Sequence, residues 1–389
     1  MDFHPLLLST EDYPTVALGK LKEARLAKGL PVYDFGAGDP LIEVEPFLNE
    51  ALIKALPKIP QYPTAKGEKY LLEAIQGYLK RVVNVSLELD QIIPTGGSKE
   101  AIYHMAPMLL HAGAKRRGII YPDPGYPIYA SSATFHGGVH YPQPTREETG
   151  YQMDLSILPE KILKDSAIAW ICNPHNPTGA VGDLSWLKRQ VEVARNHDIL
   201  LCVDECYLEI TPERRAPSVL EVAKEGVLAV HSLSKRSGFT AHRSGFIAGD
   251  RKVVSLLGKI RPHMGVASPV FVQAMAAAAW KDDAHVQRRL KAFNERRELA
   301  SAFLDRHGFS YCGKDATFYL WIKMPSSCSY DEKEYCRRLF EGAGILASPG
   351  PFYGAEGRGH FRLALVPDMN GTQEALAAWE RLIKKGDLI

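Results

Sequence analysis

Short apolar runs alternate with amphipathic segments between residues 91 and 250. Each run predicts a strand and ends in polar, glycine or proline residues. The runs are QIIPTGG (91–97), RGIIYPDPGY (117–126), AIAWICNP (167–174), ILLCVDECY (199–207) and VLAVHSLSK (227–235). A helix is predicted from Ser98 to Leu110, directly after the first run. This alternation is typical of a mostly parallel sheet with helices on both faces, hence of an α/β protein.

The pattern changes after about residue 280. The later elements are a long amphipathic helix (284–308), a strand-like run (316–324), a helix (331–341), the run HFRLALV (360–366) and a final helix near 372–385. This mixture predicts a smaller α+β domain. We expect a large domain of residues 46–280 and a small domain formed by residues 1–45 with 281–389. The turn-like DFGAGDP (34–40) should pack against the small domain.

Composition narrows the range of partners. The chain has 47 basic and 45 acidic residues, so its formal net charge of +2 provides no field for nucleic acid or an anionic membrane. The six cysteines form no CxxC pair, which predicts reduced thiols in a cytoplasmic protein without a metal site. The start of the chain lacks a basic signal region, and no stretch approaches the ~18 apolar residues of a membrane span. Small molecules are the expected partners.

Unusual polar residues gather at the predicted strand ends, where ligands bind in parallel sheets. Asn176 lies in NPHNPTG, and Asp204 and Tyr207 lie in VDECY. Lys235 lies in SLSK. Each residue alone has an ordinary explanation as a turn former, a cap, a core residue or a solvated lysine. Together they match pyridoxal 5′-phosphate, which needs an amine for its aldehyde, a carboxylate for its ring nitrogen and donors to its ring oxygen.

The cofactor match assigns a role to each of these residues. Lys235 is the amine, and Asp204 keeps the ring nitrogen protonated. Asn176 and Tyr207 donate to the ring oxygen. We expect Lys235, Asp204 and Tyr207 to be catalytic.

The phosphate of this cofactor needs an anion site. Arg243 can grip it through two parallel hydrogen bonds, helped by the hydroxyls of Ser232 and Ser234.

A second contribution to the anion site comes from GGSKEAIYHM (96–105). Gly97 and Ser98 begin a predicted helix, where free N–H groups and the helix dipole attract an anion. Lys99 adjoins this site and is counted among the cofactor-binding residues, and we expect it to be solvated rather than catalytic. Tyr126, in DPGYP, can stack on the cofactor ring.

In this ordered set of motifs the chain resembles the class I/II aminotransferases of pyridoxal-phosphate fold type I. The motifs that carry the resemblance are DFGAGDP, YPTAKGEKYLLEAI, GGSKEAI, DPGYP, NPHNPTG, VDECY, SLSKRSGFTAHRSG and FRLALV, which span nearly the whole chain. One departure is Ser244, where many relatives carry an aliphatic residue. The resemblance implies a large domain with a mostly parallel sheet, flanked by helices, and a smaller α+β domain.

The resemblance also implies substrate contacts and a dimer. Arg362 looks like the arginine that pairs with the substrate α-carboxylate, and Gly38 lies where relatives bring backbone close to the substrate. Asn176 is expected to contact the substrate as well as the cofactor. Tyr62 looks like the tyrosine that a partner subunit donates to the phosphate, so a homodimer with shared active sites is expected. His136 and His140 lie in the glycine-rich FHGGVHY and are expected in a loop rather than as metal ligands.

The motifs are compatible with three functions of this cofactor site. In an aminotransferase, the incoming amino acid displaces Lys235, whose free amine then moves the Cα proton. A carbon–sulfur β-lyase would use the same cofactor site. A regulatory cofactor-binding module is the third, and the absence of a helix-turn-helix extension or basic arm in the sequence argues against it.

Within the family, residues 232–250, 259–286 and 316–321 resemble the succinyldiaminopimelate aminotransferases of bacterial lysine biosynthesis most. This resemblance implies amino transfer between N-succinyl-LL-2,6-diaminopimelate and 2-oxoglutarate or glutamate. Aspartate and LL-diaminopimelate remain alternative donors. Arg261 is the candidate reader of the distal substrate anion, with a surface arginine as the alternative.

Overall fold

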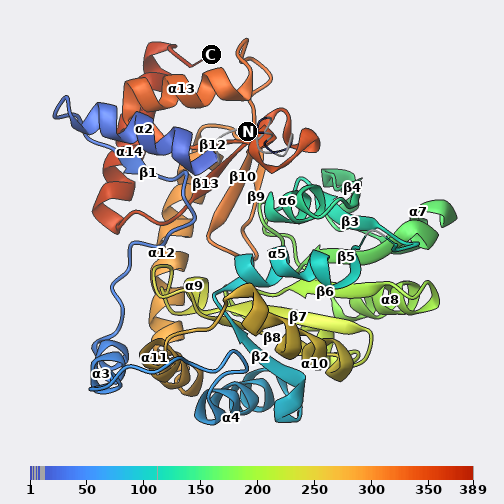
Figure 1. Cartoon of the computed structure of the whole chain (residues 1–389). Coiled ribbons are helices and arrows are strands. Elements are labelled where there is room, and N and C mark those ends of the chain that lie inside the picture. Colours follow the sequence, from blue (N-terminus) through green and yellow to red (C-terminus); the bar gives the residue numbers. More distant parts are fainter. Residues whose placement is uncertain (2, 4–5, 7, 9–13, 112, 389) are drawn as a thin grey trace.

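The computed structural model describes residues 1, 3, 6, 8, 14–111 and 113–388, and these form one large sheet, one smaller sheet and a separate strand pair (Figure 1). The large sheet has seven strands in the described chain: β2 (Ile92–Thr95), β3 (Gly118–Asp123), β4 (Val139–Pro144), β5 (Ser166–Cys172), β6 (Leu200–Asp204), β7 (Val227–Ser232) and β8 (Gly245–Gly249). Their spatial order is β2-β8-β7-β6-β5-β3-β4.

Strand direction decides which residues meet at the edge of this sheet. The neighbouring pairs from β4 to β7 are parallel, whereas β8 is antiparallel to both β7 and β2. Gly245, the first residue of β8, pairs with the last residues of its two neighbours, Ser232 and Thr95. The residues just before β8 therefore lie at the same edge as the carboxyl ends of the parallel strands.

Both faces of the large sheet are buried. In β5, Ile168 and Trp170 join one apolar cluster, while Ala169 and Ile171 join another on the opposite face. This two-residue period explains why the strands appear in the sequence as continuous apolar runs. Polar groups are consequently confined to the strand ends.

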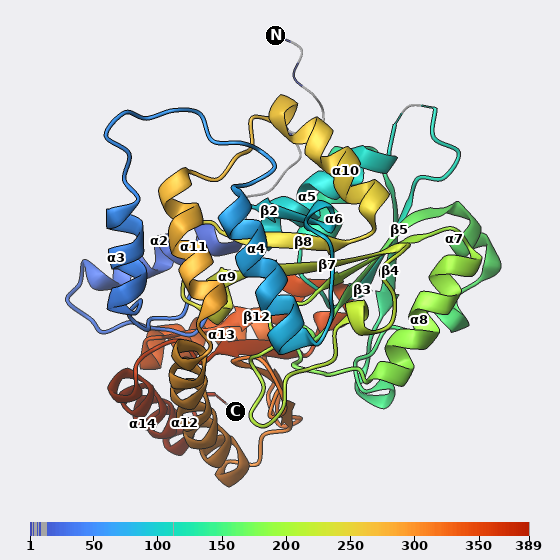
Figure 2. The ribbon, with the colours of Figure 1, turned by 90° about the horizontal axis from the view of Figure 1, so that it is seen from below.

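Helices cover the two faces. The cluster that contains Trp170 is closed by α5 (Ser98–Leu109), α6 (Ile128–Phe135) and α10 (Arg251–Ile260). The opposite cluster is closed by α3 (Pro46–Lys54), α4 (Lys69–Tyr78), α7 (Glu160–Asp165), α8 (Leu184–Asn196) and α11 (Val270–Lys281). Figure 2 shows α4 crossing this second face.

The smaller part of the molecule is built on an antiparallel sheet of order β12-β13-β10-β9. Its strands are β9 (Tyr311–Cys312), β10 (Tyr319–Lys323), β12 (Ser348–Pro349) and β13 (His360–Ala364), and β1 (Tyr33–Asp34) pairs with β11 (Ile345–Leu346). Its helices are α2 (Pro14–Leu26), α12 (Ala284–Arg306), α13 (Glu332–Ala343) and α14 (Met369–Lys385). Figure 1 shows α12 extending from beside α11 into this part.

The predicted fold class is confirmed. Residues 33–35 pack with the small part of the molecule as expected: β1 pairs with β11, and the Ala364 N–H at the end of β13 donates to the Phe35 carbonyl at 2.7 Å. The domain boundaries near residues 46 and 280 stay a prediction. No helix within residues 14–111 and 113–388 combines the length and apolarity needed to cross a membrane.

Two local predictions need correction, and one strand was missed. The apolar run 227–235 ends as a strand at Ser232, and the next four residues form the single helical turn α9 (Leu233–Arg236). The segment expected to be a loop around the histidines contains β4, with His140 in the strand and His136 at the end of α6. β4 is an edge strand with two prolines and largely exposed side chains, so it lacks the apolar pattern of a buried strand. The short strand β8 was not predicted.

Candidate active site

A cavity of about 510 Å³ opens where the strand ends of the large sheet face the small sheet. Most of the predicted site residues line it: Gly38, Ser98, Lys99, Tyr126, Asn176, Asp204, Tyr207, Ser232, Ser234, Lys235, Arg243 and Arg362. The parallel strands bring together residues that are far apart in sequence. Gly97 lies directly behind this surface, and Tyr62 and Arg261 lie elsewhere.

Lys235 is carried by α9, which begins where β7 ends. The Ser232 side chain caps this turn by accepting a hydrogen bond from the Ser234 backbone N–H at 3.1 Å. The Lys235 amine donates to the Gly38 carbonyl. The pKa of Lys235 is lowered to about 8, mainly because the amine is buried; Asp39 and Cys206 oppose this shift, and the cations Arg362 and Arg243 add to it. Near neutral pH the neutral, nucleophilic amine is therefore more abundant than in an ordinary lysine.

A buried ion-pair network holds α9 in place. The guanidinium of Arg236, the residue after Lys235, donates to Glu209 at 2.6 Å and to Asp283 at 2.8 Å. It also packs over the ring of Tyr78, 5.0 Å from the centroid. Because only 4% of the Arg236 side chain and 12% of the Glu209 side chain are exposed, water screens this pair little, whereas the Asp283 side chain is 37% exposed. The backbone that carries the Lys235 amine is thereby anchored.

Asp204, the last residue of β6, is a buried acid. Its carboxylate accepts hydrogen bonds from the Tyr129 hydroxyl at 3.1 Å and from the Cys206 backbone N–H at 3.2 Å. Burial raises the pKa of Asp204. A protonated ring nitrogen would supply the cation that such a carboxylate favours, so this position fits pyridoxal 5′-phosphate.

The anion site lies at the start of α5. Gly97 has a φ of 86°, and a Cβ atom there would come within 2.6 Å of Arg243 Nη2, so a larger residue would displace the arginine. Burial and the charge of Arg243 lower the pKa of Lys99. Two cations and a helix N-terminus thus converge with Ser98, which suits a phosphate group.

Arg362, on β13, occupies the other end of the cavity. It donates to Asn176 Oδ1 at 2.9 Å and to the Gly36 carbonyl at 3.0 Å. Its guanidinium lies over the rings of Tyr319 and Tyr353, at 3.9 and 4.7 Å from the centroids. These contacts hold the guanidinium fork in one orientation, which favours two-point binding of a carboxylate.

Arg261 does not reach the cavity. It is only 2% exposed and forms an ion pair with Glu100, whose other oxygen accepts the Gly96 N–H at 2.6 Å. Arg261 is therefore neither a surface arginine nor part of the cavity of its own chain. That it reads a distal substrate anion stays a prediction, which this pairing with Glu100 does not favour. Its position supports the glycine turn before α5.

The cavity also contains residues that sequence reasoning missed. Asp39, Tyr319 and Tyr353 line it, and Tyr129 supports Asp204 from behind. Tyr129 follows Tyr126 by three residues, a helical spacing that could have indicated a shared face. Tyr319 stands in the continuous apolar run FYLWI (318–322) and so has the pattern of a core residue.

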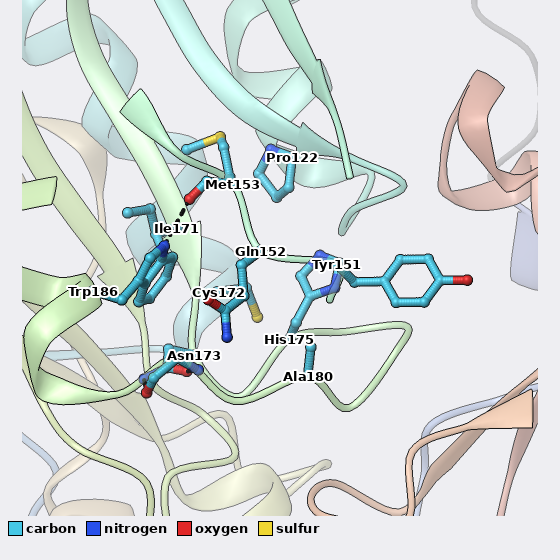
Figure 3. A pocket seen from close by; sticks show the side chains of 11 residues that line it. Pro122, Tyr151, Gln152, Met153, Ile171, Cys172, Asn173, His175, Ala180 and Trp186 are labelled. Atoms are coloured by element: carbon cyan, nitrogen blue, oxygen red, sulfur yellow. Dashed lines mark hydrogen bonds between the residues drawn. The ribbon is translucent and has the colours of Figure 1, made fainter. Parts of the chain in front are cut away.

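A second cavity lies behind the end of β5 (Figure 3). Its volume of about 10 Å³ has room for roughly one water molecule, so it cannot hold a substrate. Figure 3 shows the Trp186 indole N–H directed at the Met153 carbonyl, a hydrogen bond of 3.0 Å that closes one side. In the part of the chain that the structure describes, no cluster of three or more His, Cys, Asp or Glu residues could hold a metal ion.

Comparison with known proteins identifies the family of the chain. Residues 31–378 match the family described as aminotransferase class I and II. The chain is 33% identical to the LL-diaminopimelate aminotransferase of Aquifex aeolicus (strain VF5), with 98% of each chain covered. It is 34% identical to the enzyme of the same name from Desulforudis audaxviator (strain MP104C), with 92% of this chain and 91% of that protein covered.

A solved structure supports the same family assignment. The aminotransferase AspB from Helicobacter pylori 26695 is 29% identical, superimposes with a TM-score of 0.86 and is matched over 97% of this chain and 99% of that chain. The chain therefore belongs to the class I and II aminotransferases, which depend on pyridoxal 5′-phosphate. It is an aminotransferase, as predicted. The two curated relatives carry the name of the unsuccinylated substrate, so the succinylated substrate is not confirmed.

The first prediction concerns the amine. Borohydride reduction of the cofactor-loaded protein should place the label on Lys235. In addition, the apoprotein should combine with pyridoxal 5′-phosphate faster as the pH rises through about 8, because the Lys235 amine loses its proton in this range. Peptide mapping after reduction locates the label. The Lys99→Ala variant is the matched control, because Lys99 lines the same cavity; it should still be labelled on Lys235. A label on Lys99 would contradict the assignment.

The second prediction concerns Arg261. Replacement of Arg261 by Gln leaves the Glu100 charge without its partner. We expect the free energy of unfolding to decrease by about 3 kcal/mol. This is the lower end of the usual range for a broken buried pair, because Glu100 retains some contact with water. Urea unfolding of the apoprotein measures this loss. Arg251→Gln is the control, because the Arg251–Asp90 pair is exposed and its loss should cost less than about 1 kcal/mol. Equal losses in the two variants would contradict a structural role for Arg261.

Proposed function

We propose that this aminotransferase moves an amino group from LL-diaminopimelate to 2-oxoglutarate, a reaction of lysine biosynthesis. The observation that carries the proposal is the match, over nearly the full chain, to relatives named for that substrate. The cavity supports it through Asp39, a carboxylate in its lining whose charge acts on the Lys235 amine.

Charge favours the free diamino acid over its succinylated form. Unsuccinylated diaminopimelate carries a second ammonium group, and Asp39 is a suitable partner for it. Succinylation turns that ammonium into a neutral amide and adds a carboxylate. The residue predicted to read such an added anion, Arg261, is buried against Glu100.

The residues of the chain divide the chemistry between them. When bound, pyridoxal 5′-phosphate supplies an electron sink for the bond broken at the substrate Cα. Lys235 would hold the cofactor aldehyde, and its amine, whose pKa is lowered to about 8, would serve as the general base for the substrate Cα proton. Asp204 keeps the ring nitrogen protonated, and Asn176 and Tyr207 donate to the ring oxygen. Arg362 orients the substrate α-carboxylate.

The phosphate end completes this assignment. Arg243 neutralises the phosphate, and Ser98, Ser232 and Ser234 add hydrogen bonds. Lys99 contributes charge, and Gly97 leaves room for the arginine. Tyr126 packs against the cofactor ring, and Gly38 presents its backbone to the substrate.

The third prediction tests the substrate. With 2-oxoglutarate as acceptor, LL-diaminopimelate should give a kcat/KM at least about tenfold above those of N-succinyl-LL-diaminopimelate and aspartate, which corresponds to about 1.4 kcal/mol of transition-state binding. Asp39→Asn should reduce this preference, because the amide cannot pair with the distal ammonium as a charge. Glutamate formation measures the rates. A faster succinylated donor would restore the interpretation drawn from the sequence.

A carbon–sulfur β-lyase is the other outcome that the same cofactor site permits. A cysteine conjugate would then react with water to give a thiol, ammonia and pyruvate, without 2-oxoglutarate. The proposed function would be overturned if no amino donor gave stoichiometric glutamate and the protein instead catalysed this elimination.

We further propose that the chain works as a homodimer with shared active sites. Tyr62 is fully exposed and does not line the cavity of its own chain, so it can serve a cavity only from another subunit. Four other large apolar residues close to it in sequence are also exposed: Leu41, Ile53, Leu56 and Ile59. Exposed apolar residues concentrated in one stretch favour burial against a second copy.

The fourth prediction tests the shared site. Tyr62→Ala and Lys235→Ala each weaken or abolish both sites of a homodimer, whereas a hybrid of the two variants contains one site with both natural residues. We expect the hybrid, purified with two different tags, to recover about half of the wild-type activity at limiting cofactor. In the control, Asn176→Ala replaces Tyr62→Ala and gives no recovery, because Asn176 and Lys235 line one cavity of the same chain. No recovery with Tyr62→Ala would refute the shared site.

A further inference from the structure

Tyr319 lies where the two ends of the active site meet. It is 2% exposed, and its hydroxyl is 2.9 Å from the hydroxyl of Tyr207. The Arg362 guanidinium lies over its ring, 3.9 Å from the centroid. One side chain thus contacts both the proposed donor to the cofactor ring oxygen and the proposed substrate carboxylate site.

We propose that Tyr319 is a positioning residue, which orients the Tyr207 hydroxyl through its own hydroxyl and the Arg362 guanidinium through its ring. The inference rests on the proposed roles of Tyr207 and Arg362. It assigns Tyr319 no contact with the reacting atoms.

The strand register produces the contact with Arg362. In the antiparallel pair of β10 and β13, Trp321 is opposite Arg362, and Tyr319 is opposite Ala364. Tyr319 is therefore the diagonal neighbour of Arg362 on the same face of the sheet, within reach of a long side chain. The aromatic face attracts the cation, and burial of both groups strengthens that attraction.

The direction of the tyrosine–tyrosine hydrogen bond follows from proton count. A phenol has one proton to donate. If Tyr207 donates its proton to the cofactor ring oxygen, it can only accept from Tyr319. Burial raises the pKa of both phenols, to about 12 for Tyr319, so both stay protonated at working pH. Tyr319 is then the donor that leaves the Tyr207 proton available to the cavity.

Close packing fixes the Tyr319 hydroxyl. A Cβ atom on Gly38 would come within 2.2 Å of the Tyr319 hydroxyl oxygen, so the hydroxyl lies directly against the backbone of that glycine. The carbonyl of the same glycine accepts the hydrogen bond of Lys235. Loss of the Tyr319 hydroxyl should therefore affect the positions of the Lys235 amine and the Tyr207 hydroxyl without a change in the charges of the cavity.

The test uses the cofactor-loaded protein and two substitutions. Tyr319→Phe removes only the hydroxyl. The hydrogen bond from Tyr207 to the cofactor ring oxygen then becomes weaker, and the anionic form of that oxygen is stabilised less. The pKa of the bound cofactor, measured from its absorbance as a function of pH, should therefore rise by about 0.5–1 unit. The groups that act electrostatically on Lys235, namely Asp39, Cys206, Arg243 and Arg362, are all retained in this variant. The KM for the amino acid should change less than about twofold, because the ring under Arg362 remains.

Tyr319→Leu removes the ring as well. It should show the same absorbance shift and, in addition, raise the KM for the amino acid about fivefold or more, because Arg362 loses its aromatic support. Tyr335→Phe is the matched control: Tyr335 is a buried tyrosine of the same core that does not line the cavity, so neither the absorbance titration nor KM should change.

The outcomes separate this inference from the proposed function. An unchanged absorbance titration in Tyr319→Phe, beside a wild-type protein that transfers amino groups, overturns the role of Tyr319 alone. A wild-type protein that transfers no amino group from any donor overturns the proposed function, while the absorbance titration still tests the hydrogen bond. Equal shifts in Tyr319→Phe and Tyr335→Phe would show a general effect of core substitution and would also overturn the role.

Discussion

Burial of both faces of the large sheet is the constraint on which the rest of the structure depends. Alternate residues of β5 enter two apolar clusters, which leaves no face for polar chemistry. Polar groups are tolerated where the strands end, and the parallel direction of β5, β6 and β7 brings those ends to one edge. The reversed strand β8 begins at the same edge and so adds Arg243. The active site is a consequence of strand direction.

Charge is distributed in this cavity in a way that fits its cofactor. Arg243 and Lys99 concentrate positive charge at the start of α5, and Arg362 adds a cation at the opposite end. Between them lie the acid Asp204, whose pKa burial raises, and the Lys235 amine, whose pKa burial lowers. A bound phosphate, a substrate carboxylate and a protonated ring nitrogen would each meet a complementary group. Removal from water makes these electrostatic contacts strong enough to orient a small molecule.

Two buried ionic networks support the site from outside the cavity. Arg236 with Glu209 and Asp283 anchors the turn that carries the lysine, and Arg261 with Glu100 supports the glycine turn before α5. Buried charges of this kind tolerate little displacement, because separation of the partners leaves an unpaired ion in a poorly solvated place. They therefore hold backbone segments, rather than ligands, in position.

The sequence by itself determined the βα order, the fold class, the cofactor and most of the residues in the cavity, because apolar periodicity and strand-end motifs are local signals. Only the tertiary structure decided the place of Arg261, the strand β8 and the contacts of Tyr319. Arg261 pairs with Glu100, 161 residues away, and Tyr319 meets Tyr207, 112 residues away. Neither contact leaves a local pattern, since an ion pair or a hydrogen bond depends on the distance between side chains in space and not on their spacing along the chain.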